Sequence, residues 1–357
     1  MEGTKPVARG AGSSAVFGMR IRVLLRVYGV VACAALAACA ELDPRGTEAE
    51  SGREPGEGNP ASGAMAKWLV ALPPIVGAPL QAGTTAPGAV GQAVSRGYFK
   101  LANPVAVAAS GPDIYVVDGA TAALYRFDAV AQTALRITSV RAVPGTRIVA
   151  APDGTVYLLQ AGLSSINRYS RDGRLIATLA APNDLVRPID IAIEDSRGLV
   201  WVADATLQQI VAFHPVGKVA YIVSQRGNVA GRLESGMRGM AAGSAGVFVV
   251  DPGCRCVSEI LPDGRGLRTF GEAELVNPVA VTADRWGRVW VLDSAQQSIR
   301  IFFDGLFAGA IAFRDLGVIE SGSIAIHDST LYVADTRGGR IGAFRLIPPP
   351  GGGAPRP

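Results

Sequence analysis

Short alternating runs of apolar and polar residues recur along this chain, and six of them share one pattern. Each run has an aromatic residue, two aliphatic residues and a turn residue, and another aliphatic residue follows six positions after the turn residue. The aromatic residues are Tyr115, Tyr157, Trp201, Phe248, Trp290 and Tyr332, and the turn residues are Asp118, Gln160, Asp204, Asp251, Asp293 and Asp335. A spacing of 42 to 47 residues between such runs is typical of a β-propeller with one blade per repeat.

A strand of small apolar residues precedes each aromatic phrase, as the crowded innermost position of a blade requires. These strands are PVAVAAS from Pro104, RIVAAPD from Arg147, PIDIAIE from Pro188, RGMAAGS from Arg238, PVAVTAD from Pro278 and SIAIHDS from Ser323. The aromatic phrase supplies the second strand, a tight turn and the third strand, and a more variable fourth strand follows. The chain is therefore predicted to be all-β, a six-bladed β-propeller with four-stranded blades.

The last repeat lacks a fourth strand, because the chain after Leu346 runs into prolines, which cannot continue a sheet. A propeller must close its ring to protect its strand edges. The apolar segment 67–72 (KWLVAL) precedes the first blade, and we predict that this N-terminal strand closes the ring as the outer strand of the sixth blade. The propeller is thus placed at 65–347, and the Pro- and Gly-rich tail 348–357 is expected to be disordered.

The repeated acidic residue has two readings. Asp side chains cap turns by accepting hydrogen bonds from main-chain N–H groups a few residues on, and five of the six phrases carry Asp where the second strand ends. A ring of catalytic carboxylates is the other reading, and it is disfavoured because these turns lie far from the axis of the ring. The repeated aromatic residue is expected to pack one blade against the next.

The phrases together resemble the NHL-repeat six-bladed β-propeller family. The matching pieces of the best repeat are 277–281 (NPVAV), 290–293 (WVLD) and 298–302 (SIRIF), and the resemblance covers about residues 67–346. The repeat with Gln160 lacks the turn Asp, and the repeat around Met237 lacks the Pro. Relatives of this general shape include lyases and metal-dependent hydrolases that ring the channel mouth with His, Glu, Asp or Asn, so the resemblance implies a fold and leaves the activity open.

The N-terminus has the pattern of an export signal. Three arginines follow Met19, and an apolar run of about signal-peptide length comes after them. We therefore predict that residues 1–38 are a leader, with the true start at Met19 and a signal peptide over 19–38. The sequence 36–39 (LAAC) resembles the lipobox of bacterial lipoproteins, which implies lipidation of Cys39; an ordinary signal peptide cut near Ala38 is the alternative. Residues 39–64 are rich in Gly, Pro, Glu and Ser, which predicts a disordered tether.

These features predict a lipoprotein of the bacterial cell envelope that is anchored in a membrane and faces the periplasm. Ala40, rather than Asp, follows the cysteine, which by resemblance favours the outer membrane. The net charge of +4 belongs to the leader, because residues 39–357 contain 29 basic and 29 acidic residues. Nucleic acid is therefore not an expected partner.

Reactive groups are scarce. The chain has two histidines, His214 and His327, and neither is expected at the mouth where the first strands begin, so a three-His zinc site is excluded. No Ser nucleophile elbow or phosphate loop is present. We therefore predict no catalytic residue, no metal and no cofactor.

Two cysteines remain after the leader and the lipid site. Cys254 and Cys256 fall in the turn between the second and third strands of the fourth blade. In an oxidising compartment a small-ring disulfide is the first reading, unpaired thiols are the second, and a redox or metal role is the third.

The mouth of the ring is the default ligand site of a propeller. The polar residues just before or at the starts of the first strands are Asn103, Arg147, Arg187, Asp190, Arg238, Asn277 and Glu320. Arginines with asparagines suit an anionic or carbonyl-rich partner, such as a protein, peptide or glycan; ordinary solvated loop ends are the alternative. We expect a binding or scaffold propeller. A metal-dependent lyase or lactonase-like hydrolase that uses Asp190 and Glu320, and a structural component of an envelope complex, are the alternatives.

Overall fold

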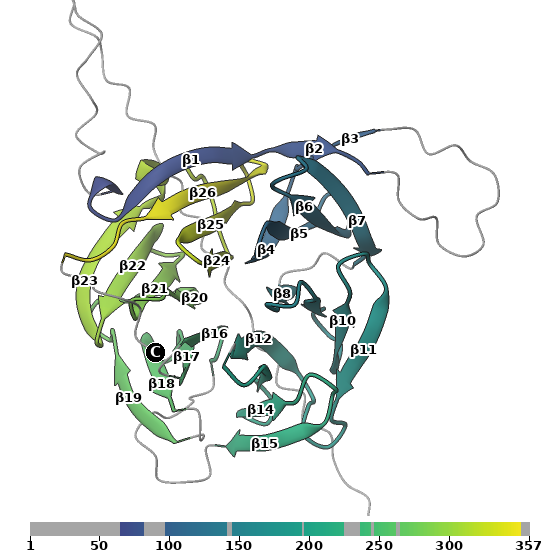
Figure 1. Cartoon of the computed structure of the whole chain (residues 1–357). Coiled ribbons are helices and arrows are strands. Elements are labelled where there is room, and N and C mark those ends of the chain that lie inside the picture. Colours follow the sequence, from purple (N-terminus) through teal and green to yellow (C-terminus); the bar gives the residue numbers. More distant parts are fainter. Residues whose placement is uncertain are drawn as a thin grey trace, which may run out of the picture. The chain divides into compact units, whose positions relative to one another are not determined.

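The computed structural model describes residues 65–81, 97–140, 145–194, 196–224, 236–243, 246–261 and 265–350, which all belong to one compact unit, Glu57–Pro357. This part of the chain folds into six four-stranded antiparallel sheets arranged as blades around a ring, as predicted (Figure 1). No helix of the described residues is long and apolar enough to cross a membrane. The leader, Cys39 and the predicted tether lie outside the described residues, as does most of the tail.

The first three blades follow one another along the chain. The first blade contains β4 (Pro104–Ser110), β5 (Asp113–Asp118), β6 (Ala123–Asp128) and β7 (Thr133–Ser139). The second blade contains β8 (Arg147–Ala150), β9 (Val156–Leu159), β10 (Ser165–Tyr169) and β11 (Leu175–Ala180). The third blade contains β12 (Pro188–Glu194), β13 (Leu199–Asp204), β14 (Gln209–Phe213) and β15 (Val219–Ser224).

The last three blades complete the ring. The fourth blade contains β16 (Gly239–Gly243), β17 (Gly246–Asp251), β18 (Cys256–Ile260) and β19 (Gly266–Phe270). The fifth blade contains β20 (Pro278–Ala283), β21 (Arg288–Asp293), β22 (Ser298–Phe303) and β23 (Leu306–Ala312). The sixth blade contains β24 (Ile324–His327), β25 (Thr330–Asp335) and β26 (Arg340–Leu346), together with β1 (Leu69–Ile75). Each inner strand contacts the inner strand of the next blade, and β24 contacts β4. The six segments predicted as first strands are therefore the inner strands.

The N-terminal strand closes the ring. β1 pairs antiparallel with β26, from Leu69 opposite Leu346 to Ile75 opposite Ile341, and the main-chain N–H of Ile347 donates to the carbonyl of Trp68 at 2.8 Å. The predicted closing strand is thus confirmed, although it begins at Leu69 and not at Lys67. It extends through two prolines to Ile75, with a register shift at the prolines. An outer strand tolerates them because its free edge needs no N–H donors.

The same segment then reaches the first blade, which the sequence did not indicate. β2 (Gly77–Pro79) pairs with β3 (Tyr98–Lys100), and Leu80 forms a parallel bridge with Ala134 of β7. The N–H of Gln81 donates to the carbonyl of Ala134 at 2.7 Å. β1 and β2 therefore run across the seam between the last and first blades (Figure 1).

The apolar core is divided among the interfaces between blades. Six clusters of buried residues lie between neighbouring blades, and each contains one of the repeated aromatic residues or has it packed against the cluster. Trp201, for example, is fully buried with Met240 and Val247 of the next blade. The prediction that these rings pack blade against blade is confirmed.

The repeated Asp is a turn cap, as predicted, and it also holds the loop in front of the inner strand. Oδ1 of Asp204 accepts from the N–H of Thr206 and Leu207, at 2.9 and 2.8 Å. Its Oδ2 accepts from the N–H of Val186 and Arg187, at 2.7 and 2.6 Å. Asp118 and Asp293 have the same two-sided contacts, and all three are fully buried. The carboxylate therefore fixes the edge of the mouth by accepting hydrogen bonds from main-chain N–H groups on both sides.

Candidate functional site

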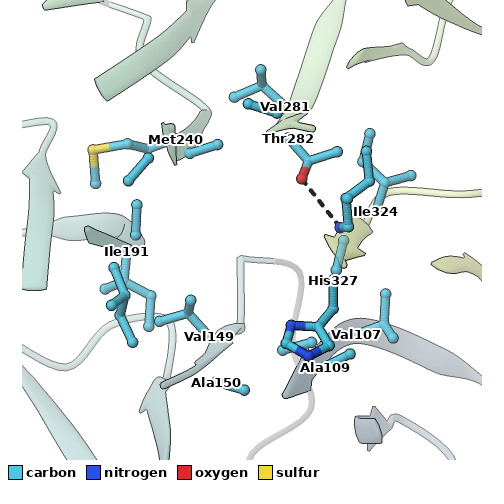
Figure 2. A pocket seen from close by; sticks show the side chains of 18 of the residues that line it. Val107, Ala109, Val149, Ala150, Ile191, Met240, Val281, Thr282, Ile324 and His327 are labelled. Carbon is cyan, nitrogen blue, oxygen red and sulfur yellow. Dashed lines mark hydrogen bonds between the residues drawn. The ribbon is translucent and has the colours of Figure 1, made fainter. Parts of the chain in front are cut away.

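A cavity of about 490 Å³ lies at the centre of the ring, and all six inner strands line it. Figure 2 shows aliphatic side chains around it, among them Val107, Val149, Ile191, Met240 and Ile324. We call the face of the ring where the inner strands begin the mouth face, and the opposite face the far face. Because blade strands alternate in direction, the turns between second and third strands also lie on the mouth face.

Two of the seven predicted ligand residues, Arg147 and Asp190, meet at the mouth end of this cavity. Nε of Arg147 lies 3.7 Å from Oδ1 of Asp190. Oδ1 of Asp190 also accepts from the N–H of Ile191 at 2.8 Å, and Oδ2 accepts from the N–H of Met240, on the next blade, at 2.7 Å. The buried carboxylate thus connects three consecutive blades.

Burial raises the pKa of Asp190 from its usual 3.8 to about 6, although Arg147 and the two amides act in the opposite direction. The folded state therefore binds this proton more tightly than the unfolded chain does. The resulting stabilisation is complete below about pH 3.8 and is lost as the pH rises through 6.

We expect this titration to appear in the difference between the wild type and Asp190→Asn. The free energy of unfolding of the wild type minus that of the variant should fall by about 2.4 kcal/mol between pH 4 and pH 7. Urea unfolding at several pH values measures it, and other titrating groups cancel in the difference. A difference that stays flat across this range would show that folding does not shift the pKa of Asp190.

The other five predicted residues lie outside the cavity wall. Arg187 and Arg238 are exposed on the mouth face, and the described part of the chain offers them no side-chain hydrogen bond or ion pair. Glu320 is also exposed there, and it forms an ion pair with Arg337 at 2.9 Å. Asp190 and Glu320 therefore do not share a site, because one is buried in the wall and the other is on the surface.

The two asparagines hold turns. The carbonyl of Asn103 accepts from the N–H of Gly119 at 2.7 Å. Nδ2 of Asn277 donates to Oγ of Ser294 at 2.8 Å. Both residues are half-buried, and both tie the loop before an inner strand to the neighbouring turn of the same blade.

The histidines lie far from the mouth. His214 is exposed in the turn between β14 and β15, on the far face. His327 lines the far end of the cavity, and its Nε2 accepts from the N–H of Gly111 at 2.6 Å (Figure 2). Among the described residues, no group of three or more His, Cys, Asp or Glu side chains is placed to hold a metal ion.

Cys254 and Cys256 are joined by a disulfide, with their Cα atoms 5.2 Å apart. Cys256 is buried and Cys254 is half-buried, and the bridge closes the turn between β17 and β18 on the mouth face. The sulfurs lie in a structural turn, next to Asp251, whose carboxylate accepts from the N–H of Gly253 at 2.6 Å.

Sequence reasoning missed a set of exposed aliphatic residues on the mouth face. Val186, Val276 and Ile319 precede three inner strands at equivalent positions and are 52%, 48% and 57% exposed. Their N–H groups donate to the buried turn Asp of their blades, so the main chain faces inward and the side chain faces solvent. Leu163 and Leu207, in the turns between second and third strands, are also exposed. In the sequence, an aliphatic residue next to a strand suggests a buried side chain. Only the hydrogen bonds from the main-chain N–H groups of Val186, Val276 and Ile319 to the turn Asp show that these side chains point outward.

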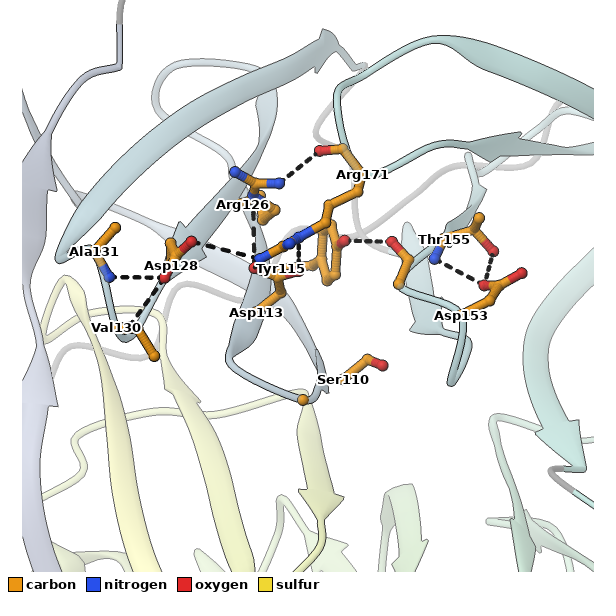
Figure 3. A network of polar contacts seen from close by, with 12 residues as sticks. Ser110, Asp113, Tyr115, Arg126, Asp128, Val130, Ala131, Asp153, Thr155 and Arg171 are labelled. Carbon is orange, nitrogen blue, oxygen red and sulfur yellow. Dashed lines mark hydrogen bonds and ion pairs between the residues drawn. The ribbon is translucent and has the colours of Figure 1, made fainter.

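The sequence analysis also did not predict the arginine contacts between blades on the far face (Figure 3). Asp113 of the first blade accepts from Nε and Nη2 of Arg171 of the second blade, at 2.5 and 2.9 Å. Arg126 donates to the carbonyl of Arg171 at 3.0 Å, and the hydroxyl of Tyr115 donates to the carbonyl of Gly154 at 2.7 Å. Burial raises the pKa of Tyr115, so the hydroxyl keeps its proton.

The arginine contact recurs around the ring. In each case one blade's guanidinium donates to a main-chain carbonyl at the end of the next blade's third strand. The pairs are Arg126 with Arg171, Arg168 with Pro215, Arg268 with Asp304, and Arg288 with Ile347. These contacts on the far face hold neighbouring blades together.

No protein-family model and no curated protein matches this chain. Solved structures do resemble it. A catalytically inactive virginiamycin B lyase from Staphylococcus aureus, with quinupristin, has a TM-score of 0.52 at 16% identity, over 70% of this chain and 84% of that chain. A nidogen/laminin complex has a TM-score of 0.52 at 16% identity, over 71% and 97%. A structural genomics protein of unknown function from Bacteroides thetaiotaomicron has a TM-score of 0.54 at 12% identity, over 78% and 76%. At these identities the likeness concerns the β-propeller fold alone.

Proposed function

We propose that this chain is an NHL-type binding propeller of a bacterial cell envelope, anchored in the outer membrane through a lipid on Cys39, and that it holds a protein partner on its mouth face. The observation that carries the proposal is the combination on that face of exposed aliphatic side chains with the exposed arginines Arg187 and Arg238. In the described residues, no group of three or more His, Cys, Asp or Glu side chains is placed to hold a metal ion.

The chemistry of the mouth face favours a protein over a glycan. Protein interfaces combine apolar side chains at their centre with arginine, and such arginines often contribute most to affinity. Val186 and Arg187 are adjacent, and Leu207 lies in the neighbouring turn of the same blade. A partner segment that carries carboxylates beside apolar side chains would match both features.

Changing Arg187 and Arg238 together to Ala is expected to weaken the partner at least tenfold, because each charge-assisted hydrogen bond contributes about 1.5–3 kcal/mol. Crosslinking in intact envelopes identifies the partner, and titration of the purified pair measures the affinity. The matched control is Arg174→Ala with Arg345→Ala, two exposed arginines away from the mouth face, which should leave the affinity unchanged.

Two results would contradict the proposal. Equal affinity in the Arg187 and Arg238 double variant and in its control would remove the mouth face as the binding surface. Strong sensitivity to a chelator, or turnover of a lactone or peptide by the purified chain, would support the lyase or hydrolase alternative instead.

Lipidation has its own test, because Cys39 lies outside the described residues. Replacing Cys39 with Ala is expected to release the chain from the membrane fraction and to remove the mass of the acyl chains. The wild type should be recovered with the outer membrane. If both forms fractionate alike and neither carries the mass of acyl chains, the lipid anchor is wrong. If the wild type is recovered in the inner membrane alone, the assignment to the outer membrane is wrong.

A further inference from the structure

The disulfide between Cys254 and Cys256 lies in a turn that five blades share. In each of these turns the repeated Asp pairs, across the hairpin, with the residue five positions later. The pairs are Asp118 with Ala123, Asp204 with Gln209, Asp251 with Cys256, Asp293 with Ser298, and Asp335 with Arg340. The five turns therefore have the same length and the same register.

The last residue of each turn also has the same backbone conformation. Arg255, which stands between the two cysteines, has a φ of 56°, in the left-handed region. The equivalent residues are Ala122, Gln208, Gln297 and Gly339, with φ values of 49°, 51°, 46° and 61°. Those four turns contain no cysteine. The turn thus forms without a cross-link, and the disulfide is not needed to hold it.

The cross-link also adds little to stability. A disulfide stabilises a fold mainly by restricting the unfolded chain, and the effect grows with the length of the closed loop. Cys254 and Cys256 are two positions apart in the sequence, so the closed loop is very short. Coupling is reciprocal, so a bond that stabilises the fold weakly is itself weakly protected by the fold.

The turn keeps the two cysteines together whether or not they are bonded. Their Cα atoms are 5.2 Å apart, within the usual range for a disulfide. Because the hairpin register sets the positions of residues 254 and 256, reduction leaves the two thiols adjacent. The bond is therefore able to open and close without rearrangement of the blade.

The two sulfurs differ in accessibility. Cys256 is 1% exposed, whereas Cys254 is half-buried and the neighbouring Arg255 is exposed. The turn lies on the mouth face, so a thiolate from another molecule reaches Cys254 and not Cys256. The positive charge of Arg255 favours its approach.

We propose that the Cys254–Cys256 disulfide oxidises an accessible dithiol, a pair of cysteine thiols on a protein or peptide, by thiol–disulfide exchange. One thiol loses its proton, and its thiolate attacks Sγ of Cys254. The bond to Cys256 breaks, and Sγ of Cys256 leaves with the electron pair and takes up a proton. The second thiolate then attacks the dithiol's own sulfur in the mixed disulfide, and Cys254 leaves and is protonated. The dithiol becomes a disulfide, and this chain carries two thiols.

The test is incubation of the oxidised full chain, with Cys33→Ser and Cys39→Ser, with dithiothreitol or with a synthetic peptide that contains two cysteines. Each folded chain should oxidise about one equivalent of dithiol, because no other electron acceptor is present. Chromatography follows the oxidised product, and alkylation with peptide mapping follows residues 254–256. The variant with Cys254→Ala and Cys256→Ala should fold and oxidise none.

Reduction of the folded chain by glutathione distinguishes an exchangeable disulfide from a structural one. Millimolar reduced glutathione should open at least half of the bond without denaturant, whereas structural disulfides resist the glutathione pool. Reduction should lower the melting temperature by only a few degrees. Calorimetry of the oxidised and reduced chains measures this shift.

Single variants assign the roles of the residues. With Cys256→Ser, Cys254 should form a mixed disulfide with oxidised glutathione, and with Cys254→Ser the buried Cys256 should react at least about tenfold more slowly. Arg255→Glu should slow reduction by glutathione several-fold and leave the melting temperature unchanged. Arg345→Glu, the same charge change at an exposed position away from the mouth face, should leave the rate unchanged.

Several results would overturn the assignment. A bond that stays oxidised in glutathione until the chain unfolds, or a chain that unfolds when the bond is reduced, would make the disulfide structural. Equal reactivity of Cys254 and Cys256 would contradict attack at Cys254, and equal rates in Arg255→Glu and its control would contradict the contribution of Arg255.

The activity does not depend on the protein partner proposed for the mouth face. Exchange with dithiothreitol should be unchanged in the variant with Arg187→Ala and Arg238→Ala, which is designed to weaken that partner. Failure of the exchange and failure of partner binding are thus separate results. A loss of exchange in this folded variant would contradict the independence of the two sites.

Discussion

Deleting residues 67–75 is expected to abolish the cooperative unfolding transition of the propeller. β1 is the outer strand of the last blade, and its removal exposes the edge of β26 together with the cluster that contains Leu69, Phe344 and Leu346. The ring of Trp68, which lies edge-on to Trp290 with centroids 6.4 Å apart, is lost as well. Burial of one Leu contributes about 1.5–3 kcal/mol, and loss of the half-buried Trp68 ring removes part of the roughly 3–5 kcal/mol that loss of a fully buried Trp costs. The sum is comparable with the whole stability of many domains, about 5–15 kcal/mol.

Scanning calorimetry and size-exclusion chromatography of the deletion variant measure this effect, as a missing transition and a shift to aggregates. The matched control is a circular permutant in which a short Gly-rich turn joins residue 347 to residue 67 and the chain opens at Val130. The ends suit such a turn because the N–H of Ile347 already bonds to the carbonyl of Trp68 at 2.8 Å. Val130 is 83% exposed in a turn, so a break there removes no strand.

The permutant should keep the melting temperature of the wild-type ring within a few degrees. A deletion variant that melts like the wild type would disprove the role of β1 in closure. A permutant that fails to fold would show that a covalent link between the two chain ends cannot take the place of their original arrangement at this seam.

Replacing Arg288 with Met is expected to destabilise the fold by about 3–5 kcal/mol, because it leaves a buried carboxylate without its counter-ion. The Arg288 side chain is 2% exposed and pairs with Asp284, which is fully buried. Its Nη1 donates to the carbonyl of Ile347 at 2.8 Å, at the point where the two chain ends meet. The guanidinium also lies over the rings of Trp286, Trp290 and Trp68, with 4.9, 5.3 and 5.9 Å to their centroids.

A double-mutant cycle separates the charge from the packing. Asp284→Asn with Arg288→Met should be less destabilised than the sum of the single variants by about 2 kcal/mol or more, because the pair is then removed as a unit. Arg285→Met is the matched control: Arg285 is exposed, lies over the same Trp286 ring at 5.1 Å, and should change the free energy of unfolding by less than about 1 kcal/mol. A loss below 1 kcal/mol for Arg288→Met would contradict the expectation.

Much of the fold was predictable because it depends on local, repeated patterns. The aromatic residue, the two aliphatic residues and the turn Asp specify a second strand and its end in each copy, whatever surrounds them. The closing strand 67–72 was predictable for a different reason. A blade that ends before Pro348 leaves an unpaired edge, and one apolar segment was available to cover it.

The candidate site was less predictable, because the solvent exposure of a side chain depends on which other residues pack around it in the folded structure. Arg147, Arg187 and Arg238 all stand near the starts of inner strands, but they are not equivalent in register. Arg147 pairs with Leu159 as Asp190 pairs with Ala203, so it lies against Asp190 in the cavity wall. Arg187 and Arg238 precede their strands and face solvent. Asp190 and Met240 are 50 residues apart in the chain, and their hydrogen bond exists only because adjacent blades converge at the axis.

The sequence by itself determined the inner strands and the turn caps, because periodicity and turn chemistry act locally. It also determined the number of blades, through the count of repeats, and the closing strand, because the last repeat leaves one unpaired edge. Only the tertiary structure decided which side chains face the cavity, which aliphatic residues remain exposed, and how arginines link the blades. Val186 and Arg288 show the reason. An aliphatic residue is exposed and an arginine is buried, because the packing of other blades, and not the residue type, sets the environment of each.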